Sequence, residues 1–214
     1  MVYFFQRTEI WTLTWQGWIV AAIALSLGFM ASIRWIYPFL AVSRPLSKAD
    51  VAVVEGWIPD DVLKTLVADL QRYSLVITTG HPVYYGRYLT GYDSFSEVAA
   101  DSLVLFGLPD DAVTPIPSTW VKRNRTFSSA IAVRDWLLQT HPDIQAVNLY
   151  SMGPHARRSW LIFRRALHPI QVGIYTAAPP DYEPQQWWQS SSGTRTVLAE
   201  AISYLYASLV TWTR

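Results

Sequence analysis

Residues 151–159, with the sequence SMGPHARRS, combine the polar groups most suited to chemistry. They follow a short apolar run and precede a helical pattern, so they fall at the amino-terminal end of a predicted helix. Backbone N–H groups at such an end attract anions. Arginine there opposes the helix dipole and is unfavourable unless an anion or acid lies nearby. We predict an anion site formed by Ser151, Gly153, Arg157 and Arg158. The alternative is that both arginines pair with surface acids.

Two side chains are candidates for proton transfer. His155 lies in the same segment, and imidazole is the side chain that titrates near neutral pH. Glu97 begins another predicted helix, where a carboxylate facing a crevice serves as an acid or a base. The alternative for Glu97 is simple compensation of the helix dipole.

A basic segment, residues 122–126 (KRNRT), precedes a further predicted helix. Arg125 offers directed hydrogen bonds to a phosphate, and the Thr126 hydroxyl offers another. Both would act together with the backbone N–H groups of the helix start. The alternative is a solvated basic loop in which Thr126 caps the helix.

Two predicted strands end in a polar residue followed by glycine, at Glu55-Gly56 and at Thr79-Gly80. Glycine allows backbone to approach a ligand closely. We therefore predict that Glu55, Gly56, Thr79 and Gly80 belong to the substrate-binding edge. Ordinary turn chemistry is the alternative at either pair.

These segments are connected by strands that alternate with helices. Apolar, β-branched runs predict strands near residues 51–54, 75–78, 112–116, 146–150 and 172–175. Helical patterns predict helices between them and a last helix over residues 194–210, with Val197, Leu198, Ala201, Ile202, Leu205 and Leu209 on one stripe. This alternation predicts an α/β, Rossmann-like parallel sheet with helices on both faces. Ligands bind such sheets beyond the carboxyl ends of the strands.

A hydrophobic segment precedes this domain. Residues 18–33 carry no charge, and apolar character resumes over residues 35–42; together they reach the roughly 20 residues that a membrane-spanning helix needs. A cleaved signal peptide, the alternative, usually has a shorter apolar region. We expect an N-terminal flank (1–14), a transmembrane anchor (15–42), a linker (43–48) and a domain (49–214). Arg34, Arg44 and Lys48 follow the anchor, and the positive-inside rule then favours a cytoplasmic domain.

Composition excludes several classes of protein. The chain has no cysteine, which excludes disulfides, thiolate catalysis and cysteine-ligated zinc. A net charge of +1 gives no reason to expect a nucleic-acid partner. The histidines lack the spacing of metal ligands, so no metal site is predicted. No Walker loop, G-x-G-x-x-G fingerprint or G-x-S-x-G elbow is present, and the cofactor stays unassigned.

The order and spacing of these motifs resemble the YdcF/SanA/ElyC-like family over about residues 49–206. The resemblance is carried by Glu55-Gly56, Thr79-Gly80, Ser96-Glu97-Val98-Ala99, Gly107-Leu108-Pro109, residues 125–130 (RTFSSA) and residues 153–159 (GPHARRS). This chain departs from the family where Glu55 replaces a glycine and where Arg125, Ser128 and Ser129 replace an asparagine and a Glu-Asn pair.

The resemblance implies a Rossmann-like fold and a role in the bacterial envelope, around cell-wall glycan and its polyprenyl-phosphate carrier lipids. Anchored members look extracytoplasmic, which opposes the charge rule above, so we expect a single-pass plasma-membrane protein with an extracytoplasmic domain. The expected partners are the membrane and a phosphate-bearing small molecule or lipid-linked precursor. Three functions remain open: an enzyme acting on such a precursor, a non-catalytic sensor of nucleotide or lipid phosphate, and a structural protein with a degenerate site.

Overall fold

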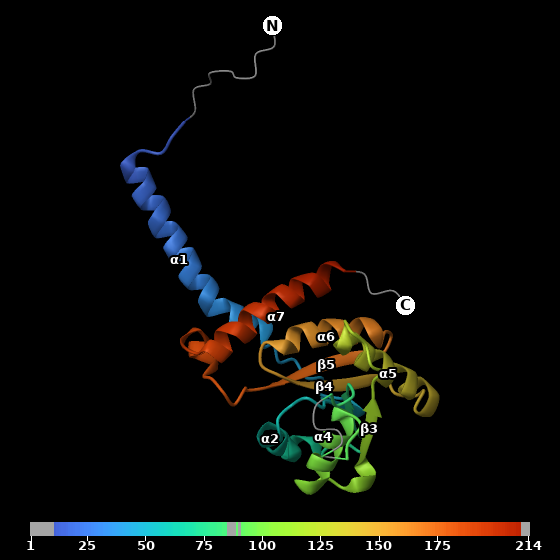
Figure 1. Cartoon of the computed structure of the whole chain (residues 1–214). Coiled ribbons are helices and arrows are strands. Elements are labelled where there is room, and N and C mark those ends of the chain that lie inside the picture. The colour runs from blue at the N-terminus through green and yellow to red at the C-terminus, as the bar shows by residue number, and fades with distance from the viewer. Residues whose placement is uncertain (1–10, 85–88, 90, 211–214) are drawn as a thin grey trace. The chain divides into compact units, whose positions relative to one another are not determined.

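The structure is a computed structural model that describes residues 11–84, 89 and 91–210 (Figure 1). Residues 1–10 of the predicted flank and residues 211–214 at the end of the predicted domain lie outside the described residues. The chain divides into two compact units, Met1–Trp35 and Ile36–Arg214.

The long helix α1 (Trp15–Leu40) is long and apolar enough to cross a membrane. Its 26 residues rise about 39 Å at 1.5 Å per residue, more than the roughly 30 Å of a bilayer's hydrocarbon core.

The second unit begins at Ile36, earlier than the boundary at residue 49 that we expected from the sequence. Tyr37 and Leu40, in the last turn of α1, are buried in this unit, and Val42 is buried after them. Arg44 then forms an antiparallel bridge with Ile174. The predicted linker is therefore packed onto the domain, because its apolar residues and backbone groups find partners there.

Five strands form one parallel sheet in the order β3-β2-β1-β4-β5. They are β1 (Val51–Glu55), β2 (Val76–Gly80), β3 (Val113–Pro117), β4 (Ala146–Met152) and β5 (Gln171–Ala177). The predicted α/β, Rossmann-like fold is confirmed. The chain runs outward from β1 to β3 and then returns to β4 on the other side of β1. The strand order therefore reverses between β1 and β4, the place where such sheets bind ligands.

Helices cover both faces of the sheet (Figure 1). One face carries α2 (Asp60–Leu70) and α4 (Phe95–Leu105), and the other carries α5 (Arg125–Thr140) and α6 (His155–Ala166). The last helix, α7 (Ser191–Leu209), packs against α6. Two short 3-10 helices, η1 (Asp110–Ala112) and η2 (Pro184–Gln189), complete the connections.

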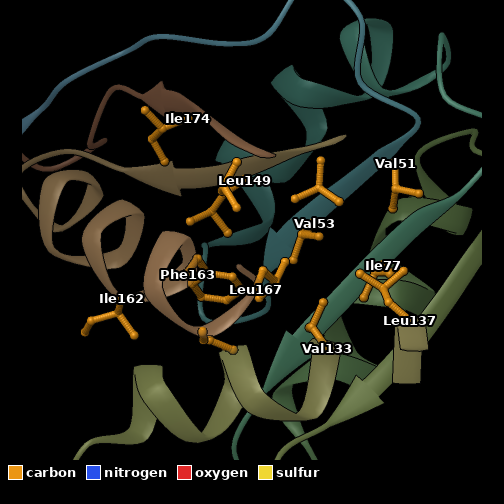
Figure 2. Close-up of a cluster of buried hydrophobic side chains, with 14 of the residues drawn as sticks. Val51, Val53, Ile77, Val133, Leu137, Leu149, Ile162, Phe163, Leu167 and Ile174 are labelled. Atoms are coloured by element: carbon orange, nitrogen blue, oxygen red, sulfur yellow. The ribbon is translucent and has the colours of Figure 1, made fainter. Parts of the chain in front are cut away.

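The core lies on both sides of β1, all of whose residues are buried. Side chains along a strand alternate between the two faces: Val51 and Val53 face α5 and α6, while Ala52 and Val54 face α2 and α4. Figure 2 shows the first of these clusters, in which Phe163 of α6 and Leu167, just after α6, pack among the valines and leucines of the strands. This two-sided burial explains the apolar run in the sequence.

The apolar stripe predicted on α7 behaves differently. Val197 is buried, but Leu198, Ile202, Leu205 and Leu209 are 50%, 69%, 59% and 83% exposed. The helix is rotated so that Val197, Gly193 and Ala207 face the domain instead.

Candidate functional site

A cavity of about 840 Å³ lies at the carboxyl ends of β1, β2 and β4. The starts of α5 and α6 and one face of α7 complete its walls. Eight of the predicted site residues line it: Glu55, Thr79, Gly80, Arg125, Thr126, Gly153, His155 and Arg158. The topology thus brings together segments that are far apart in the sequence, as the strand-end rule predicts.

His155, the first residue of α6, lines the cavity. Its Nδ1 lies 2.9 Å from Oε1 of Glu200, and its Nε2 lies 3.5 Å from Oε1 of Glu55. Trp57 meets the imidazole edge-on, with 4.8 Å between ring centroids. The ring is thus held between two carboxylates and one indole.

Two carboxylates make this histidine cationic at neutral pH. Burial alone would lower the pKa of His155, but the charge of Glu55 and the hydrogen bonds to Glu200 and Glu55 outweigh it. The pKa of His155 is raised to about 9. His155 therefore enters the site as a proton donor.

Glu55 is buried beneath His155 at the end of β1. Ser151 donates to its Oε2, and Ser159 donates to its Oε1 across 2.8 Å. Burial would raise the pKa of Glu55, but the charge of His155 and the hydrogen bonds from His155, Ser151 and Ser159 hold it below its usual range. Ser151 thus acts as a support for Glu55 and does not line the cavity.

Glu200 of α7 binds Arg158 as well as His155. Nε of Arg158 donates to Oε2 across 2.7 Å, and Nη2 donates to Oε1 across 2.9 Å. Nη2 also lies 2.9 Å from Nδ1 of His155. Because a guanidinium can only donate, both groups direct their protons to the same oxygen of Glu200. Burial would raise the pKa of Glu200, but these hydrogen bonds and charges lower it to about 2.

Glu55, His155, Arg158 and Glu200 form a charged tetrad with two negative and two positive members. Burying charges is costly unless they are paired, and each member of the tetrad contacts an opposite charge. The arginine that opposes the dipole of α6 is thus compensated within the protein by Glu200.

Arg157 points away from the cavity. Its guanidinium lies 3.9 Å from the ring centroid of Phe39, and its Nε donates to the Phe39 carbonyl oxygen. Neighbouring helical residues are about 100° apart around the axis, so only one of the two arginines can face the cavity. The structure places Arg158 there, and Arg157 secures the end of α1.

Glu97 also lies away from the cavity lining. Its Oε2 accepts the backbone N–H groups of Asp93, across 2.8 Å, and of Ser94, across 3.1 Å. The Ser94 hydroxyl accepts the N–H of Glu97 in return, which completes a capping box at the start of α4. The structure places Glu97 in the helix-start role that was the alternative to catalysis.

Gly56, after β1, and Gly80, the last residue of β2, leave room for the start of α4. A Cβ on Gly56 would lie 2.4 Å from the carbonyl oxygen of Phe95, and one on Gly80 would lie 2.9 Å from Cβ of Phe95. Both glycines therefore admit the first turn of α4. Gly80 lines the cavity as well, whereas Gly56 does not.

The basic loop before α5 supplies further positive charge. Lys122, Arg123 and Arg125 line the cavity, and Nη1 of Arg125 lies 3.4 Å from Nε2 of His81. The N-cap residue of α5 is Asn124 and not Thr126, and it makes no side-chain cap. Thr126 lies inside the helix, where Arg158 donates to its hydroxyl across 3.4 Å.

The hydroxyl of Thr79 stands out among the cavity residues. Thr79 is buried and lines the cavity, yet its Oγ1 makes no hydrogen bond within the part of the chain that the structure describes. Buried hydroxyls are normally paired.

Sequence reasoning missed Glu200, Ser159, Trp57 and Tyr182, of which all but Ser159 line the cavity. A signal existed for Glu200, because it is the only charged residue between positions 196 and 210. A carboxylate in an otherwise apolar helix segment is expected to pair with a positive charge if it is buried, because charged side chains are rarely buried unpaired. Trp57 and Tyr182, with His81 and Phe95, give the cavity aromatic walls.

No group of three or more histidine, aspartate or glutamate side chains suited to a metal ion occurs within residues 11–84, 89 and 91–210. Comparison of the chain with protein-family models and with curated proteins gives no match.

Proposed function

We propose that this protein is a single-pass, membrane-anchored envelope protein whose cavity binds a phosphate-bearing ligand, a cell-wall or polyprenyl-lipid precursor. The domain would lie on the extracytoplasmic side, as the resemblance to the YdcF/SanA/ElyC-like family implies. One observation carries the proposal: Lys122, Arg123 and Arg125, from the loop before α5, line the cavity that His155 also lines.

The positive charge available to a ligand comes from this basic loop. Within the tetrad the charges cancel, so His155 and Arg158 add little net attraction. Lys122, Arg123 and Arg125 outweigh Asp181, the remaining acid in the cavity wall. A phosphate therefore meets a surplus of positive charge at this wall.

Two helix starts reinforce this attraction. Both α5 and α6 begin at the cavity, and neither has a side-chain cap on its first N–H groups. By contrast, serine side chains cap α4 and α7. Uncapped helix starts favour phosphate oxygens, and the unpaired Thr79 hydroxyl offers one more donor nearby.

His155 is suited to protonate such a ligand. Its Nε2 is 3.5 Å from Glu55, longer than an ordinary hydrogen bond, while Ser151 and Ser159 already satisfy Glu55. Because the contact with Glu55 is long, the Nε2 proton can pass from Glu55 to the leaving oxygen of a phosphate ester as the P–O bond breaks. Water would supply the new oxygen on phosphorus and return a proton to His155. Glu200 holds the ring in position through Nδ1.

The complete pairing of the tetrad favours a second candidate function, a non-catalytic sensor of nucleotide or lipid phosphate. In that case the tetrad has a structural role in the cavity wall, and the basic loop alone recognises the ligand. The two functions differ in whether the bound compound is turned over.

The test is ligand-induced thermal stabilisation of the full chain in detergent, with inorganic phosphate, sugar nucleotides and a short-chain polyprenyl phosphate. Ligands that bind only the folded state raise the melting temperature. We expect at least one compound to do so, and a Lys122→Ala/Arg125→Ala variant to lose the shift. Arg157→Ala, outside the cavity, is the matched control and should keep it.

A preference for polyprenyl phosphate over free phosphate and sugar nucleotides would identify a lipid substrate. Stabilisation by all compounds alike would identify phosphate itself as the recognised group. If no compound raises the melting temperature, or if the double variant responds like the wild type, the phosphate-binding proposal is wrong.

Turnover separates the two functions. Hydrolysis that is lost in His155→Gln, while the thermal shift persists, supports the enzyme. Binding without turnover in the wild type supports the sensor.

A further inference from the structure

Helix α7 has two faces of opposite character. Six residues of α7 line the cavity: Thr196, Glu200, Ile202, Ser203, Tyr206 and Ala207. An apolar stripe formed by Leu198, Ile202, Leu205 and Leu209, at spacings of four, three and four residues, is centred about 180° around the helix from Glu200. Ile202 belongs both to this stripe and to the cavity wall. Each of the stripe's members is at least half exposed. One side of α7 thus completes the site, and the other presents Leu198, Leu205 and Leu209, with Ile202 between the two.

Such a surface needs an explanation. Scattered exposed leucines are normal, but a contiguous apolar strip usually marks an interaction surface. The stripe contains no acid, because Glu200 points to the cavity. The exposed Arg195 lies one turn before Leu198, and Arg165 donates to the carbonyl oxygens of Ala207 and Ser208 near the other end of the stripe. An apolar stripe on the surface of a helix can be buried among the headgroups and upper acyl chains of a bilayer.

The second unit also contains the end of the apolar helix α1. Within this unit, the Phe39 ring meets the Tyr204 ring of α7 edge-on, with 5.5 Å between centroids. The guanidinium of Arg157 also packs over the Phe39 ring. The point where the apolar helix joins the domain therefore lies against α7.

The length of α1 gives the depth of that point. Its rise of about 39 Å compares with about 30 Å for the hydrocarbon core and 40–45 Å for a bilayer with its headgroups. If α1 spans the bilayer, Phe39 lies at the headgroup level. Tyrosine favours this level, and α7 carries Tyr204 and Tyr206.

We propose that α7 lies in the membrane interface, with the stripe Leu198, Ile202, Leu205 and Leu209 inserted among the lipids. The cavity wall that carries Glu200 then adjoins the bilayer surface, where a lipid-linked phosphate is presented. This inference rests on α1 being a membrane span, which is part of the proposed function.

Fluorescent labelling of the full chain in lipid nanodiscs tests the inference, since nanodiscs leave both membrane faces accessible. The natural chain has no cysteine, so each engineered cysteine carries an environment-sensitive label at one position. The stripe positions are Leu198→Cys and Leu205→Cys. The control Leu105→Cys lies on α4, on the other face of the sheet, where Leu105 is 81% exposed. The variant Leu25→Cys reports on α1 itself.

We expect spin-labelled lipids to quench the labels at Leu198 and Leu205 at least twofold more than the label at Leu105. Aqueous iodide should quench in the opposite order. Equal iodide quenching at Leu205 and Leu105, with lipid quenching at Leu25, overturns this inference and leaves the anchor intact. Absence of lipid quenching at Leu25 overturns the anchor itself.

A label at Leu205 that is shielded from both quenchers indicates a protein partner on the stripe, a second copy or another chain, and also overturns the bilayer assignment. A Leu205→Cys variant that fails to fold is recognised by its melting temperature, and the Leu198 label then decides alone.

Discussion

Nδ1 of His155 lies 2.9 Å from Oε1 of Glu200, although 45 positions separate the two residues in the chain. This contact, with the Arg158 pair beside it, joins the start of α6 to the middle of α7. An arginine at the start of a helix is unfavourable unless an anion or acid lies nearby, and Glu200 is that acid for Arg158. The position of Arg158 is therefore no longer evidence for a bound anion. The case for a bound phosphate therefore depends on the basic loop and the uncapped helix starts.

Stability should fall on both sides of a plateau between about pH 5 and pH 6.5. The folded pKa of His155 is about 9, above the unfolded value near 6.5. The stabilisation is therefore complete below pH 6.5 and is lost as pH rises toward 9. The Glu200 pKa of about 2 works in the other direction, with stability lost as pH falls below about 4.5.

The melting temperature, measured between pH 4 and pH 9.5, tests the predicted plateau and the loss of stability on either side of it. The His155 shift corresponds to at most about 3.4 kcal/mol, and a Glu200→Gln variant should lose much of the alkaline slope. A wild-type curve that is flat from pH 6.5 to 9 would contradict the assignment of His155.

His81 should titrate in the opposite direction to His155. Burial lowers its pKa, and the charge of Arg125 lowers it further, although its hydrogen bond to the Pro82 carbonyl raises it. At pH 7.5 we expect a protonated imidazole at position 155 and a neutral one at position 81, by nitrogen-detected NMR of labelled histidines. Arg125→Ala should raise the His81 pKa and leave that of His155 unchanged. The same protonation state at both positions would refute this.

The adjacent arginines should differ sharply in their effect on stability. Arg158→Ala leaves the partly buried Glu200 carboxylate without its bidentate partner, and breaking a fully buried pair in this way costs about 3–5 kcal/mol, an upper bound here. Arg157→Ala removes the contact with the Phe39 ring, worth about 0.5–1 kcal/mol at a partly exposed site.

Denaturant unfolding followed by circular dichroism compares the two arginine variants. Arg158→Lys keeps the positive charge but loses the bidentate hydrogen bonds to Glu200, so its free energy of unfolding should lie between those of the wild type and Arg158→Ala. Similar losses for Arg157→Ala and Arg158→Ala would show that the tetrad is not the main support of α7.

Glu97 should matter for its hydrogen bonds and not for acid–base chemistry. Glu97→Ala removes the acceptor of the Asp93 and Ser94 N–H groups and should cost about 1 kcal/mol, as other capping losses do. Glu97→Gln retains an acceptor suited to a capping box and should be nearly as stable as the wild type. Both variants should keep full ligand-induced thermal stabilisation. Loss of any measured turnover in Glu97→Gln would restore Glu97 as a catalytic candidate.

Much of the fold was predictable because its signals are local. The apolar run at β1 predicts a strand buried on both faces, and the structure confirms it. The alternation of strands and helices predicts the parallel sheet and, through the strand-end rule, the edge where His155, Arg125 and Thr79 meet. Glu97 remained ambiguous because a first-turn glutamate suits both a capping box and a crevice.

The sequence by itself determined the element types, the α/β class, the apolar helix and the edge at which the polar strand ends gather. Each follows from periodicity over a few neighbouring residues. Only the tertiary structure decided that Arg158 faces the cavity, that Arg157 binds Phe39, and that Glu200 is the acid beside His155. These choices depend on the rotation of α6 and α7 about their axes. That rotation is set by packing of Val197 and Ala207 against distant parts of the chain, which no local pattern records.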